Sequence, residues 1–329
     1  MVLLEHVIKD FLVAVQPVKY DSSWLAFITD GHFAVAIFFV LSGYVLSLSQ
    51  LNSPKNLFHL FITRYCRLTI PILVTCTITY IFLLLGLIYI TGPYYQFSHT
   101  IYGLLKFSFF DVFFDYDNLR SYSPALWTMS TELLGSYILY GVVRYFRGQF
   151  RYDILIPIVI AITLLFFKPY IACFIFGYLI AELNLRYLPP NTKLISPASL
   201  LVFTSVVVMV SIYQESDDWL KCLLASALIL AISYSPTLKK VFTNSVFLFL
   251  GKISFTLYLV QFTVIFSLSA FMVSKSRAYD VVNLATTNFN IAITVIVCIL
   301  FGYLLVPIDA YSIKISKKIA SMSLKKRII

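Results

Sequence analysis

The stretch GHFAVAIFFVLSGYVLS, from Gly31 to Ser47, is almost wholly apolar, yet it begins with an imidazole and carries Ser42 and Gly43 in its middle. A segment that only had to sit in lipid would need neither feature. Small residues let another backbone or a ligand come close, and an imidazole near the membrane boundary is expensive unless it has a partner or a task. The stretch therefore predicts a membrane helix that borders a chemical site.

The composition of the whole chain also indicates a membrane protein. Its 329 residues are 60% hydrophobic and 12% charged, against about 25% charged for ordinary soluble domains. Apolar runs recur along the sequence, and each approaches the roughly 17–25 residues that a spanning helix needs. These runs are 33–49, 70–91, 133–146, 154–167, 169–185, 196–213, 219–237, 246–272 and 288–308, with a tenth apolar segment at 1–16. We therefore expect an all-α, polytopic membrane protein, a bundle of about ten transmembrane helices.

The first apolar segment starts abruptly at Met1. No charged region precedes it and no small-residue cleavage site follows it, which makes it a poor signal peptide. It is better interpreted as the second half of a membrane helix. We therefore expect the first helix to be truncated in this chain.

The net charge of +10 is distributed in a pattern typical of membrane topology. Acidic residues such as Asp30 and Asp218 are concentrated in the loops between the basic ones, and the positive-inside rule then places the basic loops on the cytoplasmic side. With ten spans, both termini are expected in the cytoplasm of a multi-pass protein of the cell (plasma) membrane. The basic segments lie near 55–67, 144–151, 186–193, 239–240 and 310–329.

The chain is expected to form one membrane domain, 1–329, with 310–329 as a basic cytoplasmic tail. Such a tail meets anionic lipid headgroups, and no nucleic-acid partner is implied. The loop 92–125 is rich in Tyr, Phe and Asp, and it is expected to fold over the external mouth of the bundle. The five cysteines are odd in number and have no Cys/His spacing, which predicts neither a disulfide framework nor a metal site.

Several polar residues near the ends of apolar segments have plain structural explanations. His6 and His32 could be interfacial histidines at helix ends. Arg64 and Arg67 lie three residues apart on one helical face; they could anchor a cytoplasmic helix end, or clamp phosphates. Trp127 is ordinary at a membrane boundary.

Three further polar residues lie inside apolar segments. Glu132 stands at the edge of a span, where a carboxylate needs a partner or a polar cavity. The segment LGKISFTLYLVQF places Tyr258 and Gln261 in an apolar run. Polar groups in membrane helices face the interior of the bundle, so we expect these side chains to be buried there.

Taken in order, these segments resemble the transmembrane acyltransferase 3 family. FFVLSGYVL (38–46) resembles the second-helix signature of that family, and RYCRLTIP (64–71) is similar to the RxxRLxxP that follows it. WTMSTEL (127–133) resembles the W-[ST]-x-x-x-E element, and LGKISFTLYLVQ (250–261) resembles the LGxISYxLYLxH element. The resemblance extends from the first residues to about residue 265.

Two departures from the family pattern affect the expected activity. The first helix of the family carries an Arg, then ten intervening residues and then a His, and His6 corresponds to that His. The Arg would then lie upstream of Met1, and we therefore expect the chain as it stands to be weak or inactive. Gln261 stands where many relatives have His, and an amide cannot carry a proton at neutral pH.

The resemblance implies an enzyme, an acyltransferase. It would move an acyl group, most commonly acetyl, from cytoplasmic acyl-CoA to a hydroxyl of an outer-face carbohydrate, lipid or small molecule. No bound cofactor or metal is implied, because acyl-CoA (acetyl-CoA) is the donor substrate. Its partners would be membrane lipid, acyl-CoA and the hydroxyl acceptor.

The resemblance also implies roles for individual residues. His6 would be the general base or a transient acyl carrier, and Glu132 an orienting or charge-balancing group, both near one polar cavity with Ser42 and Gly43. Arg64 and Arg67 would bind the donor phosphates, while Ser42 and Gly43 would let the pantetheine arm approach. The acceptor would contact His32, Trp127, Tyr258 and Gln261.

Two alternatives remain open at the level of sequence. A small-molecule transporter would be expected to show duplicated halves and paired broken helices, and we find no convincing repeat. A degenerate, non-catalytic relative that binds a glycan or lipid would agree with the missing Arg and with Gln261.

Overall fold

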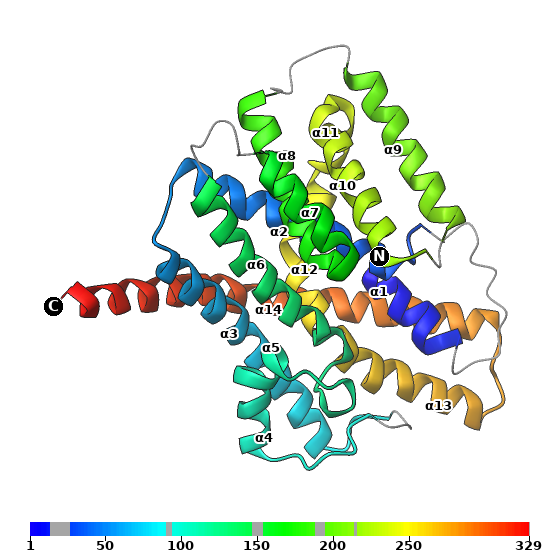
Figure 1. Cartoon of the computed structure of the whole chain (residues 1–329). Helices are drawn as coiled ribbons and strands as arrows, with labels where there is room; N and C mark the ends of the chain where they lie inside the picture. The colour runs from blue at the N-terminus through cyan, green and yellow to red at the C-terminus, as the bar shows by residue number, and fades with distance from the viewer. Residues whose placement is uncertain (14–26, 90–93, 147–153, 188–194, 214–215, 329) are drawn as a thin grey trace. The chain divides into compact units, whose positions relative to one another are not determined.

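The computed structural model describes residues 1–13, 27–89, 94–146, 154–187, 195–213 and 216–328. Every regular element among these residues is helical (Figure 1), which confirms the all-α class. The chain divides into two compact units, and each is described by itself. Unit 1 comprises 1–2, 22–61 and 134–248, and unit 2 comprises 3–21, 62–133 and 249–329.

Each of the nine predicted apolar runs overlaps a helix, although the run 70–91 continues past Leu84, where its helix ends. Long apolar segments satisfy their backbone hydrogen bonds internally in this way, as a lipid environment requires. The helices are α2 (Gly31–Asn52), α3 (Leu57–Leu84), α6 (Trp127–Phe146), α7 (Leu155–Phe167), α8 (Pro169–Glu182), α9 (Ile195–Ile212), α10 (Asp218–Tyr234), α12 (Ser245–Val264) and α14 (Leu284–Ile328). Shorter elements are α1 (Val2–Glu5), η1 (His6–Val13), η6 (Leu183–Tyr187), α11 (Pro236–Phe242), η7 (Ile265–Ser269) and α13 (Ala270–Ala278).

Among the described residues, four helices are long and apolar enough to cross a membrane, or five if α10 and α11, bent by 102°, form one span. The chain is thus a multi-pass membrane protein. Other apolar runs form shorter helices, among them α7, so the predicted total of about ten spans stays a prediction. The basic segment 310–329 is, up to Ile328, the end of α14; its cytoplasmic location also stays a prediction. The basic loop positions in 147–151 and 188–193 lie outside the described residues.

Two glycines bring α2 and α8 into direct backbone contact in unit 1. A Cβ atom on Gly43 would lie 2.3 Å from the carbonyl oxygen of Phe174, and one on Gly177 would lie 2.3 Å from that of Val40. Only glycine fits where two helix backbones approach so closely. The close approach that Gly43 permits is therefore made by α8, and the predicted contact of Gly43 with pantetheine stays a prediction.

We expect Gly43→Ala and Gly177→Ala each to lower the free energy of unfolding by about 1–3 kcal/mol, because each methyl group would overlap backbone that cannot move aside alone. Gly141→Ala, in α6 of the same unit, is the matched control: nothing lies within 4 Å of its added Cβ. It should be neutral or slightly stabilising, because alanine favours helix. Thermal unfolding in detergent measures all three, and equal midpoints would contradict this account of the packing.

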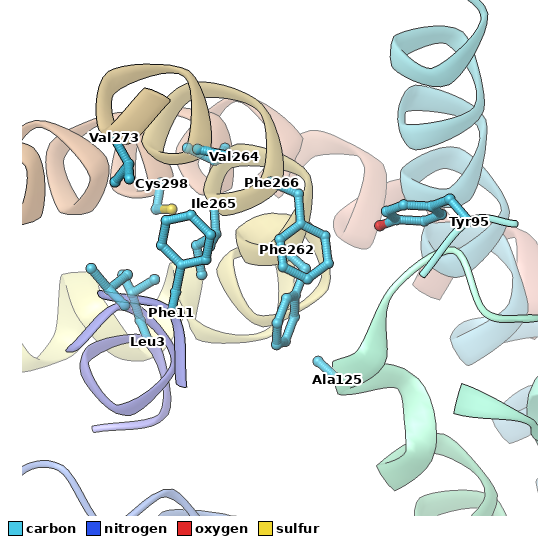
Figure 2. Close-up of a cluster of buried hydrophobic side chains, with 12 residues drawn as sticks. Leu3, Phe11, Tyr95, Ala125, Phe262, Val264, Ile265, Phe266, Val273 and Cys298 are labelled. Atoms are coloured by element: carbon cyan, nitrogen blue, oxygen red, sulfur yellow. The ribbon is translucent and has the colours of Figure 1, made fainter. Parts of the chain in front are cut away.

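Unit 2 has a hydrophobic core built around η7 and the first residues of the chain. Figure 2 shows Leu3 and Phe11 beside Ile265 and Phe262, with Cys298 of α14 behind them. The core brings together segments from both ends of the sequence. It also positions His6, which belongs to η1 between Leu3 and Phe11.

The loop segment 94–126 of unit 2 is folded, as its aromatic content predicted. It contains the short elements α4 (Ile101–Lys106), η3 (Phe107–Asp111), α5 (Val112–Phe114), η4 (Asn118–Arg120) and η5 (Pro124–Leu126). Tyr95 donates a hydrogen bond to the carbonyl oxygen of Tyr122 at 3.1 Å, and Tyr116 donates one to that of Pro124 at 2.9 Å. Burial raises the pKa of Tyr116 to about 12, so this phenol stays neutral and keeps donating. The predicted location over an external mouth stays a prediction.

Candidate functional site

A buried ion pair joins α3 and α6 in unit 2. Nη2 of Arg64 contacts Oε1 of Glu132, and the two side chains are only 7% and 2% exposed. A carboxylate inside a membrane protein needs such a partner, and the sequence singled out both residues without pairing them. The pair links two segments that carry the family resemblance, RYCRLTIP and WTMSTEL.

Arg67 follows Arg64 by three residues on α3 but differs from it in its contacts. Its side chain is half-buried, and it has no ion pair with any described residue. Because Arg64 is already neutralised by Glu132, Arg67 is the arginine of this stretch whose charge is available to a phosphate. The two arginines predicted to bind the donor phosphates therefore differ in their surroundings: Arg64 is buried against Glu132, and Arg67 is half-buried.

His6 begins η1 and packs against α12. Its ring lies 4.6 Å from that of Phe262, centroid to centroid, at an angle of 50°. The neighbouring Gln261 is completely buried, and neither its amide oxygen nor its amide nitrogen has a hydrogen-bond partner among the described residues. Each buried group left unsatisfied costs about 1–3 kcal/mol, and in native proteins such groups commonly mark a bound water or ligand.

Tyr258 ties α12 to the start of α6. Its hydroxyl donates to the carbonyl oxygen of Ala125 at 2.5 Å and lies 2.8 Å from the hydroxyl of Thr128. Trp127 stands between these two contact residues and is half-buried. The structure therefore places two of the predicted acceptor residues, Tyr258 and Trp127, at one junction of unit 2.

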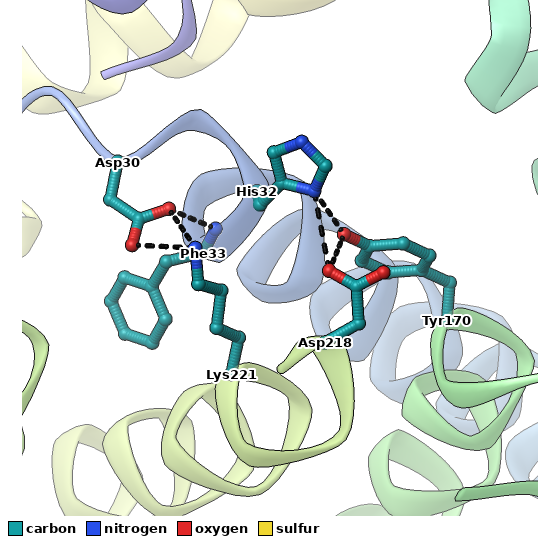
Figure 3. Close-up of polar contacts among 6 residues, drawn as sticks. All are labelled: Asp30, His32, Phe33, Tyr170, Asp218 and Lys221. Carbon is teal, nitrogen blue, oxygen red and sulfur yellow. Dashed lines mark hydrogen bonds and ion pairs between the residues drawn. The ribbon is translucent and has the colours of Figure 1, made fainter. Parts of the chain in front are cut away.

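A second polar group lies in unit 1, where the first turns of α2, α8 and α10 supply its members (Figure 3). Nδ1 of His32 lies 2.7 Å from the hydroxyl of Tyr170 and 3.3 Å from Oδ1 of Asp218. The same hydroxyl donates to Oδ1 of Asp218 at 2.7 Å. We call His32, Tyr170 and Asp218 the imidazole cluster.

The imidazole cluster is held beside a buried ion pair. Asp30 accepts a hydrogen bond from the backbone N–H of Phe33 at 2.8 Å and so caps α2. Nζ of Lys221, on α10, lies 3.0 Å from Oδ2 of Asp30, and both side chains are less than 10% exposed. The helix cap thus positions His32 in the first turn, and the ion pair holds α10 against it.

Sequence reasoning found His32 but not its partners. Tyr170 and Asp218 are 138 and 186 residues away in the sequence, and each looked like an ordinary residue at the end of an apolar run. Lys221 carried the strongest signal, since a lysine inside the apolar DWLKCLLASALIL needs a carboxylate partner.

The other predicted site residues of unit 1 lie on α2. Ser42 is half-buried beside Gly43. The shared cavity predicted for His6, Glu132, Ser42 and Gly43 draws on both units and stays a prediction.

Comparison with known proteins agrees with the motifs. Neither the curated proteins nor the solved structures contain a match to the chain. A family model described as an acyltransferase domain, that of the acyltransferase 3 family, matches residues 1–308. This match covers the four resembling segments and nearly all of the helices described above. The chain therefore belongs to the acyltransferase 3 family of membrane proteins.

Proposed function

We propose that this protein transfers an acyl group, acetyl in the simplest case, from acyl-CoA to the hydroxyl of an outer-face carbohydrate, lipid or small molecule. Membership of an acyltransferase family supports the reaction class. The observation that supports the proposal most strongly is the buried ion pair of Arg64 and Glu132. This contact joins two segments that are far apart in the sequence and that both resemble the family.

His6 is assigned as the general base or a transient acyl carrier, because imidazole can take up and release a proton near neutral pH. Glu132 balances the charge of Arg64 and holds α3 in position. Tyr258, Trp127 and Gln261 are assigned to the acceptor, and the unsatisfied amide of Gln261 supports a polar occupant beside it.

Arg67 is assigned to the phosphates of the donor. We expect Arg67→Ala to raise KM for acetyl-CoA about 10–100-fold, the effect of losing one charged hydrogen bond, while kcat falls by a smaller factor. Acetyl-CoA consumption by the full-length protein in nanodiscs measures both constants. Arg120→Ala is the matched control, because Arg120 is 80% exposed in a loop of the same unit. An unchanged KM in Arg67→Ala would remove Arg67 from the donor site.

We propose a topology with both termini in the cytoplasm of the cell membrane. The alternation of basic and acidic loops supports it. A cysteine introduced at Tyr102, which is 76% exposed, should react with an impermeant maleimide from outside, whereas one in the loop 186–195 should react from inside. The two variants need a background without the native cysteines. Labelling of both loops from the same side would contradict the topology.

A further inference from the structure

We propose that a basic pocket of unit 1 binds the headgroup of an anionic phospholipid and holds the lipid phosphate between Lys55 and Arg144. The pocket lies where α2 ends, α3 begins and α6 ends, and its lining belongs wholly to unit 1. The inference goes beyond the proposed function, because it assigns neither the donor nor the acceptor to this pocket. We call it the headgroup pocket, and its lining includes Gln50, Pro54, Lys55, Leu57, Val143 and Arg144.

Two cations line the headgroup pocket. Lys55 lies in the turn between α2 and α3, and Arg144 lies in the last turn of α6. Both residues are exposed, and neither forms an ion pair with a residue that the structure describes. An anion between them would be attracted by both charges, so the charge of the pocket favours an anionic ligand.

Gln50 adds a hydrogen-bond donor to these two charges. It is only 6% exposed, although it lines the pocket. Its Oε1 accepts a hydrogen bond from the backbone N–H of Lys55 at 3.1 Å, which fixes the orientation of the amide, because only the oxygen can accept. The amide nitrogen makes no hydrogen bond with a described residue, so its hydrogens are available to an oxygen in the pocket. Two cations beside a neutral donor fit the oxygens of a phosphate.

The rest of the lining favours a lipid over a soluble phosphate. The apolar side chains of Pro54, Leu57 and Val143 line the same pocket as the two cations, and they can contact the glycerol and the first methylene groups of a lipid. Both α2 and α3 are long and apolar enough to cross a membrane, so a pocket at their ends lies at the level of the headgroups. The proposed topology puts these ends on the cytoplasmic side, where the leaflet is anionic and basic pockets between membrane helices bind such lipids.

Native mass spectrometry of the detergent-purified protein, titrated with phosphatidylglycerol, tests the inference by measuring the dissociation constant of the first lipid retained. We expect phosphatidylglycerol to bind more tightly than phosphatidylcholine, because the trimethylammonium group of phosphatidylcholine cancels the charge of its phosphate. Lys55→Gln and Arg144→Gln should each weaken the binding of phosphatidylglycerol about fivefold, and the double variant should weaken it about 25-fold.

The double variant Lys239→Gln, Lys240→Gln is the matched control. Both lysines are exposed on α11 of the same unit, and their replacement changes the net charge by the same amount. Its binding of phosphatidylglycerol should stay near that of wild type, and equal losses in the two double variants would overturn the inference. Phosphatidylglycerol bound as tightly by Lys55→Gln, Arg144→Gln as by wild type would overturn it too.

Gln50→Glu tests the donor without removing a cation. The new carboxylate keeps an oxygen for the N–H of Lys55, but it replaces the two amide hydrogens with a negative charge. We expect the binding of phosphatidylglycerol to weaken at least about tenfold, as for the loss of one hydrogen bond to a charged group. Unchanged binding in the folded variant would remove Gln50 from the site and overturn the inference.

Soluble phosphates separate a lipid site from other phosphate sites. Adenosine 3′,5′-bisphosphate carries phosphates like those of the donor, and inorganic phosphate has no carrier at all. At matched ionic strength, we expect neither to displace the first phosphatidylglycerol from wild type, because neither contacts the apolar lining as a lipid does. Displacement by either probe would overturn the assignment to a lipid, and so would phosphatidylcholine bound as tightly as phosphatidylglycerol.

Discussion

Replacing Glu132 by alanine should destabilise the protein by about 3–5 kcal/mol, because it removes the carboxylate that neutralises the buried charge of Arg64. Arg64 and Glu132 are 7% and 2% exposed, so water cannot replace the lost contact. The denaturant dependence of unfolding in detergent micelles measures the change. The effect should be among the largest of any single substitution in unit 2.

The double variant Arg64→Met, Glu132→Leu should recover most of the lost stability, because it removes both charges and fills a similar volume. The matched control is Asp117→Ala, which breaks the exposed pair of Asp117 and Arg120. An exposed pair contributes only about 0–1 kcal/mol. If Glu132→Ala destabilised the protein no more than Asp117→Ala, the buried pair would not be an important contact of unit 2.

The positions of the helices could be predicted from the sequence because each apolar run is long and contiguous. The start of α3, however, could not be predicted from the sequence. The run was expected from residue 70, but the helix begins at Leu57, because residues 57–69 mix apolar side chains with Arg64 and Arg67. An apolar run therefore locates the uncharged part of a helix and misses the turns that carry charge.

Contacts between residues far apart in the sequence could not be predicted, for a different reason. Glu132 predicted a partner, and Gly43 predicted a close approach, but neither residue indicates which of the other helices supplies it. The imidazole cluster is the extreme case, because Tyr170 and Asp218 reach His32 only when three helix ends converge. A local sequence pattern therefore identifies a residue that requires a contact, whereas the fold determines which residue makes that contact.

His6→Ala should lower acyl transfer about 10²–10⁴-fold, the contribution typical of a general base, and more if His6 also carries the acyl group. His6→Asn keeps a polar side chain of similar size beside Phe262, and it serves if the alanine variant does not fold. His99→Ala is the matched control, because His99 lies in the loop segment 94–126 of unit 2 and has no assigned role.

The most direct test of the proposed activity uses a version of the protein extended upstream to include the Arg that the family pattern expects, which serves as wild type. Transfer of labelled acetyl from acetyl-CoA to glycerol is measured side by side for this wild type and for its His6→Ala and His99→Ala variants. We expect wild type and His99→Ala to form the ester at similar rates and His6→Ala to be slower by at least about 10²-fold. Near-equal rates in His6→Ala and wild type would contradict the assignment of His6, and no ester from wild type would contradict the proposed activity itself.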